Sequence, residues 1–152
     1  CGNGTTNDNI YFAQAKINEN EYIQNIVGIS AGNNQVYAIA ENGTVYSTGK
    51  DNYGILGLGN SSRINYFQRM AKVKDIMQVS VSQETVTLLD ANGTVWNAGR
   101  NTSGVFSNSN AGSANYSNST AYQMLYSGTT PFSEVKEVAT GYGNIILLKE
   151  KK

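Results

Sequence analysis

The side chains that usually carry enzyme chemistry are scarce in this chain of 152 residues. It contains no histidine, which removes the commonest general base, the usual partner of a catalytic serine and most zinc ligand sets. The acidic residues are scattered and fall where turns or strand ends are expected, which favours solvated turn residues over a paired-carboxylate hydrolase. We therefore expect no catalytic residue, no metal site and no cofactor.

One glycine-rich stretch superficially resembles a phosphate-binding loop. Between Gly43 and Gly49 the spacing is longer than that motif allows, and Asp51 stands where a serine or threonine should hold magnesium. The stretch also reads as a strand with no helix after it. A structural role for these glycines is favoured.

Tyrosine is the enriched residue type that could serve recognition, because the chain contains ten of them. Tyr together with Asn, Ser and Gly is the composition of adaptable binding surfaces. Tyr53, next to Asn52 in the loop after Gly49, is the best contact candidate. Ser103 is its counterpart in the next repeat, and Tyr116 lies in a stretch rich in Ser, Asn, Ala and Gly. We expect these four residues, Asn52, Tyr53, Ser103 and Tyr116, to contribute to a binding surface.

Charge and hydropathy restrict the partners. Eleven basic and eleven acidic residues give a formal net charge of zero, without the basic footprint of a nucleic-acid-binding protein. No apolar run approaches the roughly 20 residues that span a bilayer. The expected partner is therefore a protein, with no nucleic acid and no membrane span.

The single cysteine is residue 1, so no intrachain disulfide can form. It fits three interpretations: the lipid-modified first residue of a bacterial lipoprotein, a fragment boundary, or a small buried residue of a truncated repeat. Because Gly2 falls in the same repeat column as Gly49 and Gly99, we favour the last two.

The elements that must position these residues are two similar hairpins. Residues 36–49 and 86–99 each read as an apolar strand, an Asn-Gly pair and a β-branched/aromatic strand. Asn42–Gly43 and Asn92–Gly93 predict type I′ turns, in which both central residues have positive φ. Gly49 and Gly99 are expected where each strand ends and the backbone swings into the next connection.

The two hairpins belong to a repeat of about fifty residues. The approximate repeats, within one domain spanning 1–152, are 1–48, 49–98 and 99–152, with a long surface loop predicted over 107–120. We expect Ile39, Val45, Leu89 and Val95 to pack between sheets and Leu56 to insert into the core. The fold class is all-β.

The segment from Ile29 to Gly59 resembles the repeat of the regulator of chromosome condensation family. It contains Ala31-Gly32, Val45-Tyr46, Asp51-Asn52-Tyr53-Gly54 and Leu56-Gly57-Leu58-Gly59, close to that family's pattern. The family's His column holds Gln35, Thr85 and Asn144, which indicates a divergent, bacterial member. The resemblance implies a partial β-propeller of about three four-stranded antiparallel blades with circularly permuted repeats. It does not transfer the nucleotide-exchange activity of one branch of the family.

These observations favour a non-enzymatic protein–protein interaction module within a larger bacterial surface or secreted protein. A carbohydrate-binding or hydrolytic propeller is the alternative. A third hypothesis is a purely structural blade assembly, because stacked sheets leave two open faces that further repeats or a homo-oligomer would cover.

Overall fold

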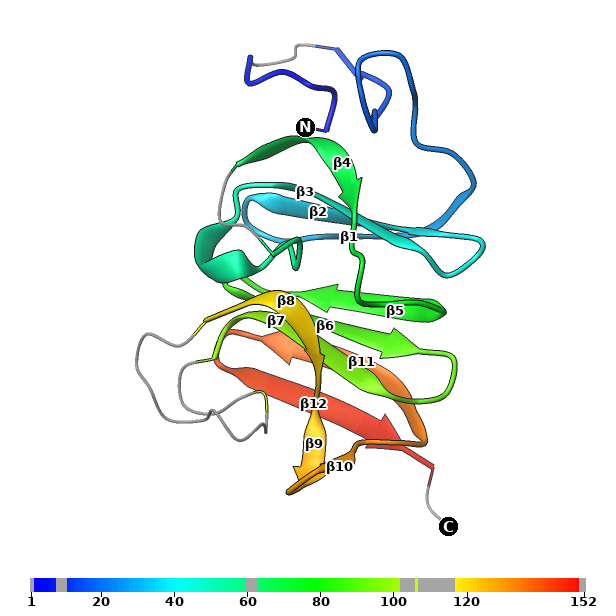
Figure 1. Cartoon of the computed structure of the whole chain (residues 1–152), viewed down its shortest axis with the longest axis vertical. Coiled ribbons are helices and arrows are strands. Elements are labelled where there is room, and N and C mark those ends of the chain that lie inside the picture. The colour runs from blue at the N-terminus through cyan, green and yellow to red at the C-terminus, as the bar shows by residue number, and fades with distance from the viewer. Residues whose placement is uncertain (1, 8–10, 60–62, 102–105, 107–116, 151–152) are drawn as a thin grey trace.

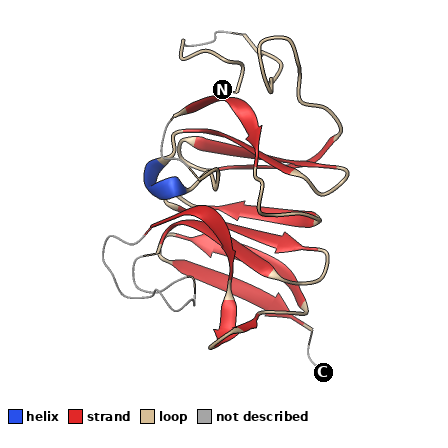
Figure 2. Ribbon diagram, in the orientation of Figure 1, coloured by secondary structure: helices blue, strands red, loops and turns tan. Residues whose placement is uncertain are grey.

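The computed structural model describes residues 2–7, 11–59, 63–101, 106 and 117–150. Its secondary structure is almost entirely β (Figure 2). In chain order the elements are β1 (Ile26–Ala31), β2 (Gln35–Ala40), β3 (Val45–Gly49), the short 3-10 helix η1 (Asn52–Gly54), β4 (Ile64–Arg69), β5 (Ile76–Val81), β6 (Thr85–Asp90), β7 (Val95–Arg100), β8 (Ser117–Gln123), β9 (Leu125–Ser127), β10 (Thr130–Pro131), β11 (Val135–Gly141) and β12 (Asn144–Lys149).

The strands form antiparallel sheets stacked along the long axis of the molecule (Figure 1). Blade 1 is the sheet β1-β2-β3-β4, blade 2 is β5-β6-β7-β8, and blade 3 is the pair β11-β12 in the described part of the chain. A small β9-β10 ribbon precedes blade 3. The predicted all-β fold with propeller-type blades is confirmed. No helix in the described ranges is long and apolar enough to cross a membrane.

The blades repeat with a clear register. β1 begins at Ile26, β5 at Ile76 and β11 at Val135, and each first strand pairs with the second strand in the same way: Ile29 with Ala38, Val79 with Leu88, Val138 with Leu147. Of the loop predicted over 107–120, residues 107–116 lie outside the described residues, and 117–120 belong to β8.

The core lies between the blades. Ile39 and Val45 of blade 1 belong to a buried cluster with Val86 and Leu88 of blade 2. Leu89 and Val95, on the other face of blade 2, pack with Val135 and Val138 of blade 3. The four predicted inter-blade residues are therefore where the sequence placed them, and Leu56 is fully buried in the first cluster. Blade 2 buries both faces, because it stacks on blade 1 through the first cluster and on blade 3 through the second.

The hairpin turns differ from the predicted type I′. The Gly43 N–H donates to the carbonyl of Ala40 (2.8 Å), and the Ala40 N–H donates to the carbonyl of Thr44 (2.8 Å). Gly43 has a φ of 75°, whereas Asn42 is not among the residues with positive φ. This is a type I turn followed by a left-handed glycine, the usual three-residue hairpin loop. Gly93, with a φ of 76°, closes the same turn in blade 2.

These turns also join neighbouring blades. The residue before each first strand has positive φ without being glycine: Asn25 (54°), Asp75 (55°) and Glu134 (61°). The Ile76 N–H donates to the carbonyl of Gly43 (3.0 Å), and the Val135 N–H to that of Gly93 (3.2 Å). A Cβ atom on Gly43 would collide with the backbone of Asp75. The turn glycine is therefore required by the next blade as well as by its own turn.

The junction between blades 2 and 3 has an additional clamp. The Gln78 side-chain amide donates to the carbonyl of Val138 (3.0 Å) and accepts the Val138 N–H (3.0 Å). The Ser80 hydroxyl oxygen accepts the Thr140 N–H (2.9 Å). Side chains of β5 thus satisfy the free backbone edge of β11, as a neighbouring strand would.

Candidate functional site

Buried polar side chains hydrogen-bond to the backbone of the loop after β3. The Asp51 carboxylate accepts the Leu56 N–H at 2.9 Å and is only 4% exposed. The Tyr37 hydroxyl donates to the carbonyl of Ile55 (2.6 Å), and the Ser47 hydroxyl to that of Leu56 (2.9 Å). Burial raises the pKa of Asp51, against the lowering effect of its hydrogen bond to Leu56. Burial, and to a lesser extent the Asp51 charge, raises the pKa of Tyr37 well above its ordinary value.

The loop after β7 uses the same construction with different residues. The Asn101 side-chain oxygen accepts the Phe106 N–H at 3.0 Å, as Asp51 does for Leu56. In the column where the family carries histidine, Gln35 donates to the carbonyl of Lys50 (2.9 Å), and Thr85 donates to that of Arg100 (3.0 Å). Both side chains therefore tie the second strand of a blade to the start of the loop.

Tyr53 stands out in this loop because of its backbone. Its φ of 59° and ψ of 18° place a bulky aromatic residue in the left-handed region, which costs about 1 kcal/mol for a residue with a Cβ atom. Its side chain is 41% exposed. Glycine would adopt this backbone conformation without the cost. We therefore infer that the half-exposed Tyr53 ring, and not its backbone, gives this residue its role.

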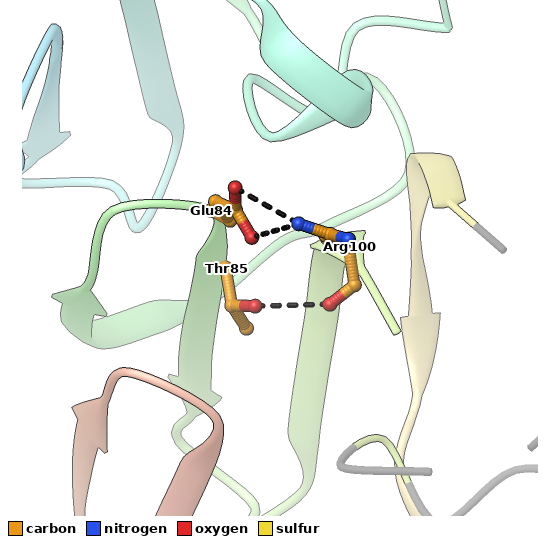
Figure 3. Close-up of polar contacts among 3 residues, drawn as sticks. All are labelled: Glu84, Thr85 and Arg100. Atoms are coloured by element: carbon orange, nitrogen blue, oxygen red, sulfur yellow. Dashed lines mark hydrogen bonds and ion pairs between the residues drawn. The ribbon is translucent and has the colours of Figure 1, made fainter. Parts of the chain in front are cut away.

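The ring of Tyr53 contacts blade 2. The Arg100 guanidinium lies 4.8 Å from the Tyr53 ring centroid, within the range of a cation–π interaction. One guanidinium nitrogen of Arg100 donates to both carboxylate oxygens of Glu84, at 3.1 and 2.9 Å (Figure 3). Backbone bonding supports the pair, since the Arg100 N–H donates to the carbonyl of Glu84 (2.8 Å). The strand ends of β6 and β7 therefore fix the guanidinium against Tyr53.

Blade 3 contributes to the same end of the molecule through Tyr142, in the turn between β11 and β12. Its ring is 70% exposed. Hydrogen bonding to Glu84 is the main factor that raises the pKa of Arg100, against the lowering effect of partial burial. The turn between β11 and β12 lies at the same end of the molecule as η1 (Figure 1). We call Tyr53, Glu84, Arg100 and Tyr142 the rim surface. It combines residues of all three blades.

The predicted binding residues are placed as follows. Asn52 and Tyr53 lie in η1, where Asn52 is exposed and its carbonyl accepts the Ile55 N–H (3.2 Å). Ser103 and Tyr116 lie outside the described residues.

Among the described residues, no group of three or more acidic or cysteine side chains is arranged to hold a metal ion.

Asn42 and Asn92 lie in the two hairpin turns, but neither has the positive φ that the type I′ prediction required. Asn42 accepts the Thr44 N–H through its side-chain oxygen (3.0 Å), and Asn92 N–H donates to the Asp90 carboxylate (2.9 Å). Gly49 and Gly99 have φ values of 121° and 102°. A Cβ atom on either would collide with the backbone carbonyl oxygen of Asn34 or Glu84, respectively. These two glycines therefore allow the close approach that builds the rim.

Sequence reasoning missed Glu84, Arg100 and Tyr142 as members of the rim surface. A signal was available for Glu84 and Arg100. They are opposite charges at one end of the paired strands: Glu84 directly precedes β6, and Arg100 is the last residue of β7. No comparable signal exists for Tyr142, because the end of the molecule at which its turn lies depends on how blade 3 stacks.

Comparison with solved structures identifies the class of fold. The chain is similar to human WBSCR16, with 21% identity and a TM-score of 0.68 over 88% of this chain and 36% of that one. It is also similar to yeast RCC1 (Prp20) in a crystal structure with Kap60, with 15% identity and a TM-score of 0.66 over 84% and 30% of the two chains. A further match is Prp20p from Saccharomyces cerevisiae, described with its binding properties to Gsp1p and histones, with 16% identity and a TM-score of 0.62 over 84% and 32%.

The chain thus has the repeat fold of proteins of the regulator of chromosome condensation type, and it spans about a third of the length of these structures. The resemblance inferred from sequence is confirmed at the level of the fold. No protein-family model matches the chain, and no curated protein sequence matches it.

Proposed function

We propose that this chain is a non-enzymatic protein-interaction module whose contact surface is the rim surface. The observation that carries the proposal is the contact between Tyr53 and Arg100, from blades 1 and 2, at the end of the molecule where the turn between β11 and β12 carries the exposed Tyr142 (Figure 1). Tyr and Arg are the residue types enriched at energetic hot spots of protein interfaces. Arg100 is already oriented by Glu84, so it would lose little side-chain freedom on binding.

The structures with the same fold support a protein partner. Yeast RCC1 (Prp20) was solved bound to Kap60, and its binding to Gsp1p and histones was described. Those partners belong to those proteins. For this chain we infer the class of partner only, a folded protein that contacts the loop rim.

The test uses chemical cross-linking of the purified chain to proteins of its own source, followed by mass spectrometry. Tyr53→Ala and Arg100→Ala should each lose the same cross-linked partner, because both remove part of one contact. Tyr11→Ala is the matched control, since Tyr11 is 81% exposed and is not part of the rim surface. Circular dichroism and thermal unfolding must show that all three variants remain folded. A partner that both rim variants retain would overturn the proposal.

We further propose a bacterial cell-surface or secreted setting within a larger protein. The composition supports this proposal, because only 14% of the residues are charged and polar uncharged residues are abundant. Surface biotinylation of intact cells that produce the complete protein tests it. Labelling only after cell lysis would contradict it.

A further inference from the structure

A shallow groove recurs at the two junctions between the described blades, at the end where the hairpin turns lie. Groove 1–2 has a volume of about 480 Å³ and lies between the turn after β2 and the first residues of β5. Groove 2–3 has a volume of about 410 Å³ and lies between the turn after β6 and the first residues of β11. Both walls of groove 1–2 belong to four-stranded blades of this chain. The hairpin turns lie on the right of Figure 1, opposite the end that carries the rim surface.

Equivalent residues line the two grooves. The pairing of the first two strands of each blade shifts by one residue near its start, and this leaves Val27, Met77 and Lys136 unpaired at equivalent places. Val27 and Met77 line groove 1–2, whereas Met77 and Lys136 line groove 2–3. The two grooves therefore share one backbone frame and differ in side-chain chemistry.

Groove 1–2 combines an apolar surface with two carboxylates. Val27 and Met77, one from each blade, are 69% and 68% exposed. Glu41 and Asp75 also line the groove and are exposed. Among the described residues, neither carboxylate takes part in an ion pair, and no lysine or arginine lines this groove. Groove 1–2 therefore presents unmatched negative charge beside exposed apolar side chains.

Two lysines lie close to Asp75 in sequence but do not line the groove. The Lys72 Nζ lies 5.6 Å from the ring centroid of Tyr122, in a cation–π contact outside groove 1–2. Lys74 directly precedes Asp75 and forms no ion pair with it. Neither lysine supplies a cation to the groove.

Groove 2–3 shows how the same frame accommodates a cation. Lys136 lines this groove, and its Nζ lies 3.8 Å from a carboxylate oxygen of Glu150. Glu134, the equivalent of Asp75, forms an ion pair with Lys149 at 3.8 Å. The carboxylates at groove 2–3 are thus matched by lysines of the chain itself, which groove 1–2 lacks.

We propose that groove 1–2 binds a lysine or arginine side chain of a protein partner. The charged head group contacts Glu41 and Asp75, and the aliphatic stem packs on Val27 and Met77. Methionine suits such a stem, because its flexible thioether adapts to irregular apolar shapes. An open groove fits a side chain carried by a larger surface, whereas small molecules are usually enclosed. This surface lies away from the rim surface and is independent of the proposed function.

The probe is N-acetyl-lysine N-methylamide, followed by NMR of methionine methyl groups labelled with carbon-13. The Met77 methyl signal should shift to saturation, whereas Met70 and Met124, which are buried outside the groove, should not respond. N-acetyl-norleucine N-methylamide, which lacks the charge, should bind about tenfold more weakly. Salt at about 0.5 M should weaken binding of the lysine probe alone. Equal binding of the two probes would overturn the proposal.

Variants of the groove residues test the contact with the head group. Asp75→Asn and Glu41→Gln should each weaken binding of the lysine probe about threefold. Asparagine tolerates the positive φ of residue 75 (55°), so the backbone is preserved. Met77→Lys copies the residue type of groove 2–3 and should abolish binding, followed by the amide signal of Gly43. Glu137→Gln is the control, because Glu137 is exposed but does not line the groove. Unchanged affinity in both carboxylate variants would reject the proposal.

Sedimentation velocity distinguishes a protein partner from a second copy of this chain. The wild-type chain and Asp75→Asn should sediment alike over the concentrations used for NMR, because the proposed lysine or arginine belongs to another protein. A concentration-dependent dimer that Asp75→Asn abolishes would assign groove 1–2 to a lysine of a second copy and would reject the proposal.

Discussion

The loop after β3 in blade 1 and the loop after β7 in blade 2 are equivalent. They make the same buried hydrogen bond with different side chains, and their surface residues differ in charge. In the interior, Asp51 and Asn101 accept the same backbone hydrogen bond from a residue five positions later. At the surface, blade 1 has Asn34 and Lys50, joined through a backbone hydrogen bond (3.0 Å), whereas blade 2 has the ion pair Glu84–Arg100. The comparison teaches that the loop requires a buried acceptor and a close backbone approach. The charges at the rim are free to vary.

The largest effect on stability is expected where Gly49 and Gly99 lie against the backbone of Asn34 and Glu84. Gly49→Ala and Gly99→Ala should each lower the free energy of unfolding by about 3 kcal/mol, because the new Cβ atom adds a backbone collision to an unfavourable φ. Gly128→Ala is the control. Its φ is 53°, but no atom lies within 4 Å of the new Cβ, so only the conformational cost of about 1 kcal/mol remains. Urea unfolding measures all three, and equal losses would contradict the requirement for close approach.

Exchanging the buried acceptors Asp51 and Asn101, so that each takes the other's residue type, should change the free energy of unfolding by an intermediate amount and with opposite sign in the two blades. Asn101→Asp should lower the free energy of unfolding by about 2 kcal/mol at pH 7, because it buries a charge where a neutral amide accepts the hydrogen bond. Asp51→Asn should raise it by up to about 1 kcal/mol, because it removes a buried charge and keeps the acceptor.

The pH dependence of the Asp51 variant follows from the raised pKa of Asp51. The folded state binds the proton of the Asp51 carboxyl group more tightly than the unfolded state does. Protonation of Asp51 therefore stabilises the fold fully below the ordinary pKa of 3.8, and this stabilisation is lost as the pH rises through the raised pKa. The gain from Asp51→Asn should therefore shrink as the pH is lowered through this range. Parallel urea titrations measure it, and a gain that grows toward low pH would refute the assignment.

The surface charges should contribute least to stability. Glu84→Gln should lower the thermal midpoint only slightly, because the ion pair is partly exposed to solvent and glutamine keeps a hydrogen-bond acceptor for Arg100. It should instead increase the mobility of the Arg100 side chain, measured by NMR relaxation of its guanidinium nitrogen. A large loss of stability would show that the ion pair is structural, and blade 1 would then need an equivalent that Asn34 and Lys50 do not provide.

The sequence was sufficient for features that depend on local pattern. Alternating strands, the Asn-Gly turns and the inter-blade positions of Ile39 and Leu89 all follow from spacing within one repeat. The turn type did not follow, because Asn-Gly suits both a type I′ turn and a type I turn with a left-handed glycine. What distinguishes them here is the contact of Gly43 with Asp75, which lies in the next blade.

The rim surface was only partly predictable for the same reason. Tyr53 was found from its loop and its residue type. Its contact with Arg100, and the location of the turn between β11 and β12 at the same end of the molecule, depend on the stacking of three blades, which no local pattern specifies.

The left-handed residue before each blade has a consequence for how such a gene can change. Asn25, Asp75 and Glu134 hold the chain at a fixed angle, and two of them lie against the turn glycine of the preceding blade. Deletion of a single codon at one of these sites would shift the first strand of the following blade by one residue. Codons gained between β7 and β8 would leave these three residues in place. Changes in repeat length should therefore be tolerated better between β7 and β8 than directly before the first strand of a blade.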